Sequence, residues 1–314
     1  MKIYHDIPEN RDLFKNAVVT IGSFDGVHLG HMKIFSKMRE IAKKSGGDPV
    51  VITFLVHPRK ILNPEYNLEV LTSNEEKIRQ IYASGIPNII LLNFTKETSQ
   101  MHAGEFFNDV LIKKIDSQHI VIGYDHAFGR NREGTIEYIE GLARTSGVTV
   151  TQVGEENFSG KPVSSTWIRD EIKTGNMELA ADLLGRKYSL EGTVTAGDGI
   201  GKTLGFPTAN IMPDEADKMI PGDGVYCVSV EIDENGKKYS GMMNIGNRPT
   251  FTNLKRSIEV NIFDFNENIY GSKIFISFHK KIRNEVKFEN VQALVKQINE
   301  DKIYAENYFN KNRI

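Results

Sequence analysis

Two histidines follow a glycine-rich segment near the N-terminus, at residues 20–31, which read TIGSFDGVHLGH. The glycines recur every four residues, so the backbone can approach a ligand closely. His28 and His31 stand three apart, and on a helix that begins here they would share one side of the first turn. The N-terminus of a helix favours an anion, and two imidazoles there can stabilise charge during phosphate transfer. The segment therefore predicts a phosphate site, with an incidental pair of surface histidines as the alternative.

Two other kinds of site are poor descriptions of this segment. The glycines do not fit the dinucleotide pattern G-x-G-x-x-G, and no third metal ligand accompanies the histidines. The chain holds a single cysteine, Cys227, which excludes an internal disulfide framework and a cysteine-cluster zinc site. Because Cys227 lies in an apolar run, we expect a packed thiol rather than a nucleophile.

A second candidate phosphate contact lies at residues 164–169, which read SSTWIR. Three hydroxyl side chains precede a helical pattern, and Arg169 falls on its first turn. Serine and threonine often cap a helix N-terminus, which is the alternative explanation. Three hydroxyls in a row with an arginine suit a phosphate clamp.

The second half carries another glycine-rich segment, GDGIGKTLGFPTAN, at residues 197–210. Its Gly-Lys-Thr at 201–203 suggests a P-loop, but the position that must be the first glycine of that motif is Ala196. Pro207 follows where a P-loop needs a helix, so we reject the P-loop. A glycine-rich arch that binds phosphates through backbone N–H groups remains.

Oxygen ligands and one carboxylate complete the candidates. Thr208 and Asn210 lie two apart, so on an extended segment they face the same side and, with a phosphate, could hold Mg²⁺. Turn chemistry after Pro207 is the alternative. Glu259 and Asn261 share the polar face of a predicted strand, and periodicity alone gives Glu259 no role beyond a solvated position.

Strands and helices alternate through the first half, which predicts a parallel sheet covered on both faces, with ligands beyond the carboxyl ends of its strands. The second half is mostly β, with a turn signal at Glu234-Asn235-Gly236, and predicts an antiparallel barrel with a terminal helix. We expect domains at 1–185 and 186–314. The expected strands are 17–21, 50–54, 88–94, 120–123, 148–153, 189–195, 224–232, 238–244, 257–265 and 273–278. The expected helices are 31–44, 75–84, 104–115, 135–145, 168–184 and 290–309.

Composition limits the function classes. A net charge of -2 provides no global positive field that would hold nucleic acid by its phosphates. The N-terminus lacks the apolar region of a signal peptide, and the apolar runs are too short for a membrane span. We therefore expect a cytoplasmic protein that binds neither nucleic acid nor membranes. Its oligomeric state is not predicted.

The motifs of the first half together resemble the adenylyltransferase half of the bacterial bifunctional riboflavin kinase/FAD synthetase family. GSFDGVHLGH and SSTWIR carry the resemblance, and three further segments agree with it: 54–59, 71–77 and 123–134. Val56 and His126 depart from the residues usual in the family, and Lys161-Pro162 stands where an arginine is frequent. No role is carried over to His126, Lys161 or Pro162.

This resemblance implies a Rossmann-like nucleotidyltransferase domain, in which the phosphate of FMN attacks the α-phosphorus of ATP and pyrophosphate leaves. It implies that His28 and His31 act on the ATP phosphates. Phe54 also has the alternative of being strand core. The implied nucleotide contacts are Gly22, Phe24, Asp25, Gly30, Ser165, Thr166 and Arg169. The implied flavin contacts are Phe54, His57, Pro58, Asp125 and Phe128.

The second half resembles the flavokinase half of the same family, through 197–210, 244–251 and 257–265. Asn261 stands where histidine is common. The resemblance implies that Glu259 is the general base for the terminal ribityl hydroxyl of riboflavin, and that Thr208 and Asn210 hold Mg²⁺ and the ATP phosphates. A flavin-binding carrier without turnover, or a protein with one decayed site, is the alternative to a bifunctional enzyme that makes FMN and FAD. The implied residues around ATP and flavin are Gly199, Gly201, Lys202, Gly205, Phe206 and Pro207.

Overall fold

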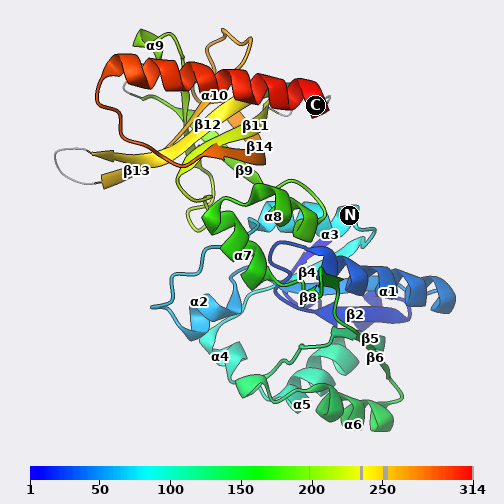
Figure 1. Cartoon of the computed structure of the whole chain (residues 1–314). Helices are drawn as coiled ribbons and strands as arrows, with labels where there is room; N and C mark the ends of the chain where they lie inside the picture. The colour runs from blue at the N-terminus through cyan, green and yellow to red at the C-terminus, as the bar shows by residue number, and fades with distance from the viewer. Residues whose placement is uncertain (198, 234–235, 250–253, 313–314) are drawn as a thin grey trace. The chain divides into compact units, whose positions relative to one another are not determined.

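The computed structural model describes residues 1–197, 199–233, 236–249 and 254–312 (Figure 1). It divides into two compact units, Met1–Ser165 and Thr166–Ile314. Three sequence expectations fall partly outside the described residues. These are the glycine-rich segment 197–210 at Asp198, the turn at Glu234-Asn235, and the end of the segment 244–251 at Thr250 and Phe251.

The first unit is built on a parallel sheet, as predicted. Its order is β1-β4-β3-β2-β5-β6, and every neighbouring pair is parallel. The chain runs from β2 outward through β3 to β4, then returns to place β5 on the other side of β2. Ligands bind at such a reversal of strand order, so the segments after β2 and β5 border the expected site. The strands are β1 (Lys2–His5), β2 (Ala17–Ile21), β3 (Pro49–Phe54), β4 (Asn88–Leu92), β5 (Ser117–Gly123) and β6 (Thr149–Val153).

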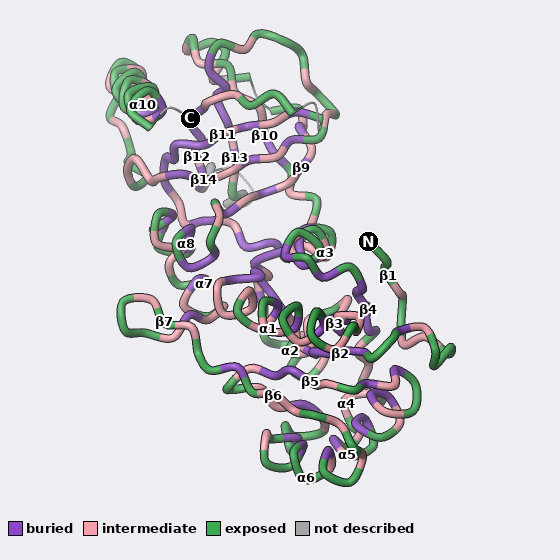
Figure 2. Tube along the Cα trace, turned by 90° about the vertical axis from the view of Figure 1, so that its right-hand side faces the viewer, coloured by how far each residue is buried: buried purple, intermediate pink, exposed green. Residues whose placement is uncertain are grey.

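Helices cover both faces of this sheet, so its central strands are largely buried (Figure 2). Phe35, Met38 and Ile81 pack on one face, and Phe107, Leu111 and Ile139 pack on the other. The expected helix 104–115 occurs as α5 followed by a π-helical segment, Phe106–Lys114. The helices are α1 (Leu29–Ser45), α2 (Pro58–Leu62), α3 (Asn74–Ala83), α4 (Lys96–Ser99), α5 (Ala103–Glu105) and α6 (Ile136–Ser146). Two short strands, β7 (Asn157–Phe158) and β8 (Lys161–Pro162), pair with each other.

The prediction of one helix over 168–184 is wrong. Two helices, α7 (Ser165–Thr174) and α8 (Met177–Leu184), are separated at Gly175, whose φ is +85°. Asn176 then begins α8 by accepting a hydrogen bond from the Leu179 N–H at 3.5 Å. A Cβ on Gly175 would lie 2.8 Å from the Tyr226 hydroxyl and 2.6 Å from Cδ of Lys281, so two side chains of the barrel leave no room for a side chain at this position. The apolar period continues across the break, which hides it in the sequence.

The second unit is a closed antiparallel barrel of order β10-β13-β12-β11-β14-β9, and pairing of β9 with β10 closes it. The predicted antiparallel barrel with a terminal helix is therefore confirmed. Strand β10 was not predicted, because Pro207 lies just before it and Pro213 is its last residue, and prolines indicate turns. The strands are β9 (Ser189–Thr195), β10 (Ala209–Pro213), β11 (Gly224–Ile232), β12 (Lys238–Pro249), β13 (Leu254–Ile262) and β14 (Lys273–Arg283), with the helices α9 (Ile200–Thr203) and α10 (Val291–Asn312).

Helix α10 packs on the outside of the barrel through one apolar cluster and one ion pair. Arg283, at the end of β14, donates to both oxygens of Asp301, whose exposure is only 2 %. Cys227 lies in the apolar cluster with Ala305 and Phe309. The expected packing of this thiol is therefore confirmed, and burial raises its pKa to about 12.

Two fragments distinguish a boundary before α7 from the boundary expected at 185. Helix α8 packs on β14, with Glu178 bonded to Lys280 at 3.0 Å and Leu183 buried. Each buried leucine-sized side chain contributes about 1.5–3 kcal/mol. We therefore expect fragment 166–314 to melt at a higher temperature than fragment 184–314, measured by circular dichroism. Equal melting temperatures would favour the boundary at 185.

Candidate active sites

The loop between β2 and α1 holds an unusual backbone. Phe24 has a φ of +45° and Val27 a φ of +37°, with Gly26 between them at +85°. Positive φ at a bulky or β-branched residue costs roughly 1–3 kcal/mol and persists only where neighbouring groups enforce it. Such strain clusters at functional sites, and this loop follows β2 at the reversal of strand order.

Asp25 enforces this conformation. Its carboxylate is 4 % exposed and accepts hydrogen bonds from the backbone N–H of Leu71 at 2.9 Å and of Thr72 at 3.1 Å. The Thr72 hydroxyl in turn accepts from the Gly26 N–H at 3.1 Å. The Ser165 hydroxyl donates to the Asp25 backbone carbonyl at 2.9 Å. The Asp25 side chain is thus committed to shaping the loop.

Lys77 links the next strand end to the same network. Its ammonium donates to the carbonyl of Phe54, the last residue of β3, at 2.6 Å, and the residue is 7 % exposed. Burial lowers the pKa of Lys77 to about 8, against the opposing attraction of Asp25. Sequence analysis matched the segment 71–77 but gave Lys77 no role. A lysine on the buried face of a predicted helix is the signal that could have found it.

The two histidines lie together, as predicted. His28 caps α1 and is 5 % exposed, and its ring stacks on that of His31 with centroids 3.7 Å apart. The backbone N–H of His28 donates to Nδ1 of His31 at 3.3 Å. Neutral His31 therefore carries its proton on Nε2, where it is a donor. A Cβ on Gly30 would lie 3.1 Å from the His28 ring, so glycine leaves room for that ring.

The remaining predicted phosphate contacts lie at the start of α7. Ser165 ends the first unit. In the second unit, Thr166 stands on the first turn of the helix and Arg169 at the start of the next turn, one turn later in the helix than the sequence pattern predicted. Gly22 follows β2, and a Cβ there would lie 2.9 Å from the Phe24 ring. Phe24 also meets His31 edge-on, at 5.2 Å between centroids.

Two of the predicted flavin contacts, Phe128 and Phe54, pack against other aromatic rings. Phe128 is only 8 % exposed and packs edge-on against Phe106 at 5.4 Å, so its ring belongs to the core. Phe54 is half-buried and meets Phe94 edge-on at 5.4 Å. For Phe128 the sequence offered no sign of this burial, because the loop after β5 reads as irregular.

The other flavin candidates lie in the loop after a strand or at the start of a helix. His57 precedes α2 and accepts through Nδ1 from the Arg59 N–H at 3.2 Å, with Pro58 in the first helical turn. Asp125 is exposed after β5, and its backbone carbonyl accepts from Arg132 at 2.9 Å. In the same loop His126 buries its Nε2 with no hydrogen-bond partner among the described residues, and burial lowers its pKa to about 4.

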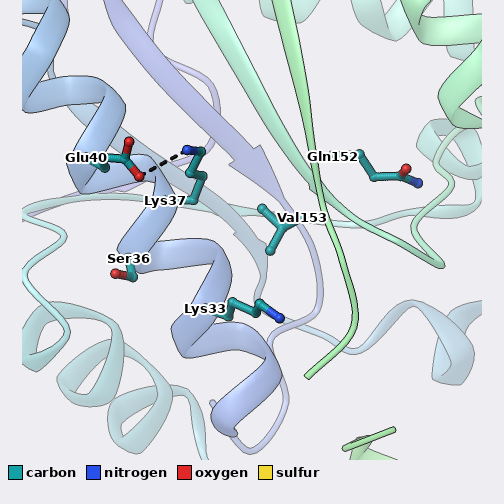
Figure 3. A pocket seen from close by; sticks show the side chains of 6 residues that line it. All are labelled: Lys33, Ser36, Lys37, Glu40, Gln152 and Val153. Carbon is teal, nitrogen blue, oxygen red and sulfur yellow. Dashed lines mark hydrogen bonds and ion pairs between the residues drawn. The ribbon is translucent and has the colours of Figure 1, made fainter. Parts of the chain in front are cut away.

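A cavity of about 310 Å³ lies elsewhere in the first unit, between the outer face of α1 and the end of β6 (Figure 3). It contains none of the predicted site residues. Lys33 bonds to the Glu155 carbonyl at 2.7 Å, and Lys37 pairs with Glu40 at 3.0 Å. Both cations therefore have protein partners, and we do not assign the cavity to phosphate binding.

In the second unit, strand register gathers the predicted kinase residues into one row. Glu259 on β13 lies opposite Asn210 on β10 and opposite Asn244 on β12. Directly opposite residues point to the same face of a sheet. The next residue along, Val260, is fully buried inside the barrel, so the row faces outward. Asn244 was missed by sequence analysis because only the register places it beside Glu259.

Side-chain oxygens that could coordinate a metal ion lie close together at this row. The Thr208 hydroxyl donates to Oε2 of Glu259 at 3.3 Å. Thr208, Asn210 and Glu259 together offer a hydroxyl, an amide carbonyl and a carboxylate, the hard ligands that Mg²⁺ prefers. Among residues 1–197, 199–233, 236–249 and 254–312 there is no group of three or more His, Cys, Asp or Glu side chains able to hold a metal.

The glycine-rich segment folds closely over these residues. A Cβ on Gly197 would lie 1.9 Å from the Asn210 amide nitrogen, and one on Gly201 would lie 2.9 Å from the Thr208 hydroxyl. Gly199 and Gly205 have φ of +69° and +85°. Helix α9 contains residues 201–203 and ends at Thr203, so no P-loop helix follows. Lys202 and Pro207 are exposed, and Phe206 packs against the cluster under α10.

Two family models match the chain. One, described as FAD synthetase, matches residues 10–167, and one described as riboflavin kinase matches residues 184–309. The bifunctional riboflavin kinase/FMN adenylyltransferase of Bacillus subtilis is 37 % identical over 302 residues, which cover 95 % of this chain and 94 % of that protein. The protein of the same description from Escherichia coli K12 is 32 % identical, over 94 % of this chain and 93 % of its own.

A solved structure has the same fold over nearly its whole length. It is described as a macrolide-efflux protein from Streptococcus pneumoniae, with a TM-score of 0.86, 33 % identity, and coverage of 96 % of this chain and 98 % of that one. Its description differs in activity from the relatives above. Among the helices of the described part of this chain, none is long and apolar enough to span a membrane.

Lys77→Met should remove the contribution of this lysine to the pH dependence of native stability. The pKa of Lys77 falls from 10.5 to about 8, so between these values the unfolded chain binds more protons than the native chain. Native stability therefore rises with pH in this window, by at most about 1.4 kcal/mol per pH unit from this group. Lys77→Met should lack the rise, and the exposed control Lys43→Met should keep it. Urea unfolding followed by circular dichroism from pH 7 to 10 measures the difference, and an unchanged slope in Lys77→Met contradicts it.

Proposed function

The chain belongs to the family of bifunctional riboflavin kinase/FMN adenylyltransferases, and we propose which of its residues phosphorylate riboflavin to FMN and which adenylylate FMN to FAD. The FAD synthetase match lies on the parallel sheet, and the riboflavin kinase match lies on the barrel. Riboflavin, FMN and ATP are thus the substrates. The observation that carries the kinase assignment is the contact between Thr208 and Glu259 in the outward row of the barrel.

In the kinase unit, Glu259 is the general base. An alcohol is a poor nucleophile until a carboxylate takes its proton, and Glu259 is the carboxylate of the row. Its oxygen removes the proton of the terminal ribityl hydroxyl while that hydroxyl oxygen bonds to the γ-phosphorus of ATP. The bond from the γ-phosphorus to the bridging oxygen breaks, and ADP leaves.

Thr208 and Asn210 would hold Mg²⁺, since their hydroxyl and amide oxygens fit a cation that retains waters and phosphate ligands. When bound, the cation neutralises charge on the ATP phosphates. Around it, the segment with Gly199, Gly201, Lys202 and Gly205 would cover the nucleotide, because its close approach to the row presents backbone N–H groups. Phe206 and Pro207, in the same segment, would also lie beside the bound nucleotide or flavin.

In the adenylyltransferase unit, His28 and His31 stabilise charge. A phosphate oxygen of FMN attacks the α-phosphorus of ATP, and the bond to the β-phosphate oxygen breaks to release pyrophosphate. The attacking phosphate is already an anion, so no protein base is needed. The stacked imidazoles at the N-terminus of α1 supply N–H donors where charge develops, and the helix dipole adds to their effect.

The other residues proposed for FAD formation bind the substrates or shape the loop. Asp25 holds the loop in which Gly22, Phe24 and Gly30 border the nucleotide. Ser165, Thr166 and Arg169 are proposed to contact the β- and γ-phosphates. On the flavin side we propose contacts from Phe54, His57, Pro58 and Asp125, with Phe128 supporting their wall from the core.

A double substitution tests the histidines. His28→Ala with His31→Ala should lower FAD formation by ~10²–10³, the usual loss when a preorganised donor is removed. FMN should accumulate from riboflavin and ATP, because the kinase unit is untouched. Chromatography of riboflavin, FMN and FAD after incubation measures both steps. The exposed control His5→Ala should make FAD normally, and undiminished FAD in the double variant would remove the histidines from the mechanism.

A second substitution tests the kinase base. Glu259→Gln keeps the shape of the side chain and removes the proton acceptor, so riboflavin phosphorylation should fall by ~10²–10⁴. Supplied FMN should still become FAD at a near-normal rate. Glu267→Gln, on an exposed residue shortly after the same strand, serves as the matched control. If Glu259→Gln phosphorylates riboflavin as fast as the control, Glu259 is only a solvated strand residue.

A further inference from the structure

Asn261 lies on the outward face of β13, two positions after Glu259. Its side chain is nearly buried, at 7 % exposure, and its amide Nδ2 donates a hydrogen bond to the carbonyl of Pro207 at 2.7 Å. Pro207 directly precedes Thr208, the residue whose hydroxyl meets Glu259 at 3.3 Å. Two successive outward side chains of β13 therefore hold two successive residues of the loop.

The register explains why a side chain is needed at this point. Strands β10 and β13 pair at Ala209 with Val260 and at Asn210 with Glu259. Continued by one residue, the pairing would set Thr208 opposite Asn261, but the ladder ends at Ala209. Beyond that end, the Asn261 amide takes the place of a backbone donor for the loop.

We propose that Asn261 is a positioning residue for phosphoryl transfer: by fixing the carbonyl of Pro207, it sets the direction in which Thr208 leaves the loop and enters the row with Glu259 and Asn210. The proposal rests on the kinase roles assigned to those residues. Catalysis by held ligands tolerates little displacement, since a misplacement of about 1 Å can cost ~10²-fold in rate.

The chemistry of the contact ranks three substitutions. Asn261→Leu keeps a similar volume and leaves the Pro207 carbonyl without its donor. Asn261→Asp sets a carboxylate against that carbonyl, two acceptors facing each other. Asn261→His places ring Nδ1 where the amide nitrogen of asparagine lies, and with its proton there the ring is again a donor.

The test uses the full-length chain and three measurements. These are kcat and KM for riboflavin, the rate of FAD formation from supplied FMN, and hydrogen–deuterium exchange of peptides spanning residues 203–212 without substrates. For Asn261→Leu we expect a fall in kinase kcat of about 10-fold, with riboflavin KM changed less than about 2-fold, and faster exchange in those peptides. Asn261→Asp should be worse, Asn261→His should recover most of kcat, and FAD formation should stay unchanged throughout.

Several outcomes overturn the proposal. The kinase kcat of Asn261→Leu could equal that of the exposed control Asn266→Leu. That result would show that the Asn261 contact helps to close the barrel but does not affect catalysis. An equal loss of both activities would mark a general loss of stability. Failure of Asn261→His to recover kcat would remove the donor from the explanation. Glu259→Gln is measured in parallel, and full kinase activity in that variant would show that the kinase assignment has failed. Failure of the positioning proposal is detected separately, because hydrogen–deuterium exchange over residues 203–212 reports the Asn261 contact whichever residue is the base.

Discussion

Taking a carboxylate out of water is strongly unfavourable, and Asp25 offsets that by accepting hydrogen bonds from two consecutive backbone N–H groups, those of Leu71 and Thr72. This contact fastens the end of β2 to the segment before α3. It also stabilises a loop with two non-glycine residues at positive φ. The stacked histidines follow directly on that loop, so their position depends on a carboxylate that need never touch a substrate. Lys77 extends the same network to the end of β3.

The barrel achieves its arrangement by a different route. There the side chains are aligned by strand pairing, which sets Asn210, Glu259 and Asn244 side by side on adjacent strands. A slip of one residue would turn Glu259 into the apolar interior, so the register that closes the barrel also fixes the position of the carboxylate that we propose as the base. In the first unit the proposed catalytic residues follow a loop held by side chains, and in the second they lie on strands held by backbone pairing.

Sequence patterns predicted the helices and strands that have a regular apolar period. They did not predict features that depend on a single contact between residues distant in the chain. Alternating strands and helices indicated the parallel sheet, which the structure confirms. The phosphate sites expected at the glycine and hydroxyl motifs stay a prediction. The break at Gly175 was hidden because the apolar period continues through it. The burial of Phe128 and the contacts of Lys77 and Asn244 arise from residues distant in the chain, which local periodicity does not report.

The burial of Cys227 beneath α10 has a practical consequence. It is the chain's single cysteine, and its thiol is packed among apolar side chains with a pKa raised to about 12. Maleimides and similar reagents attack the thiolate of an accessible cysteine. We therefore expect the folded protein to react with such labels as a cysteine-free chain would. A cysteine introduced at any exposed position would carry a fluorophore or spin label alone, without removal of the native residue.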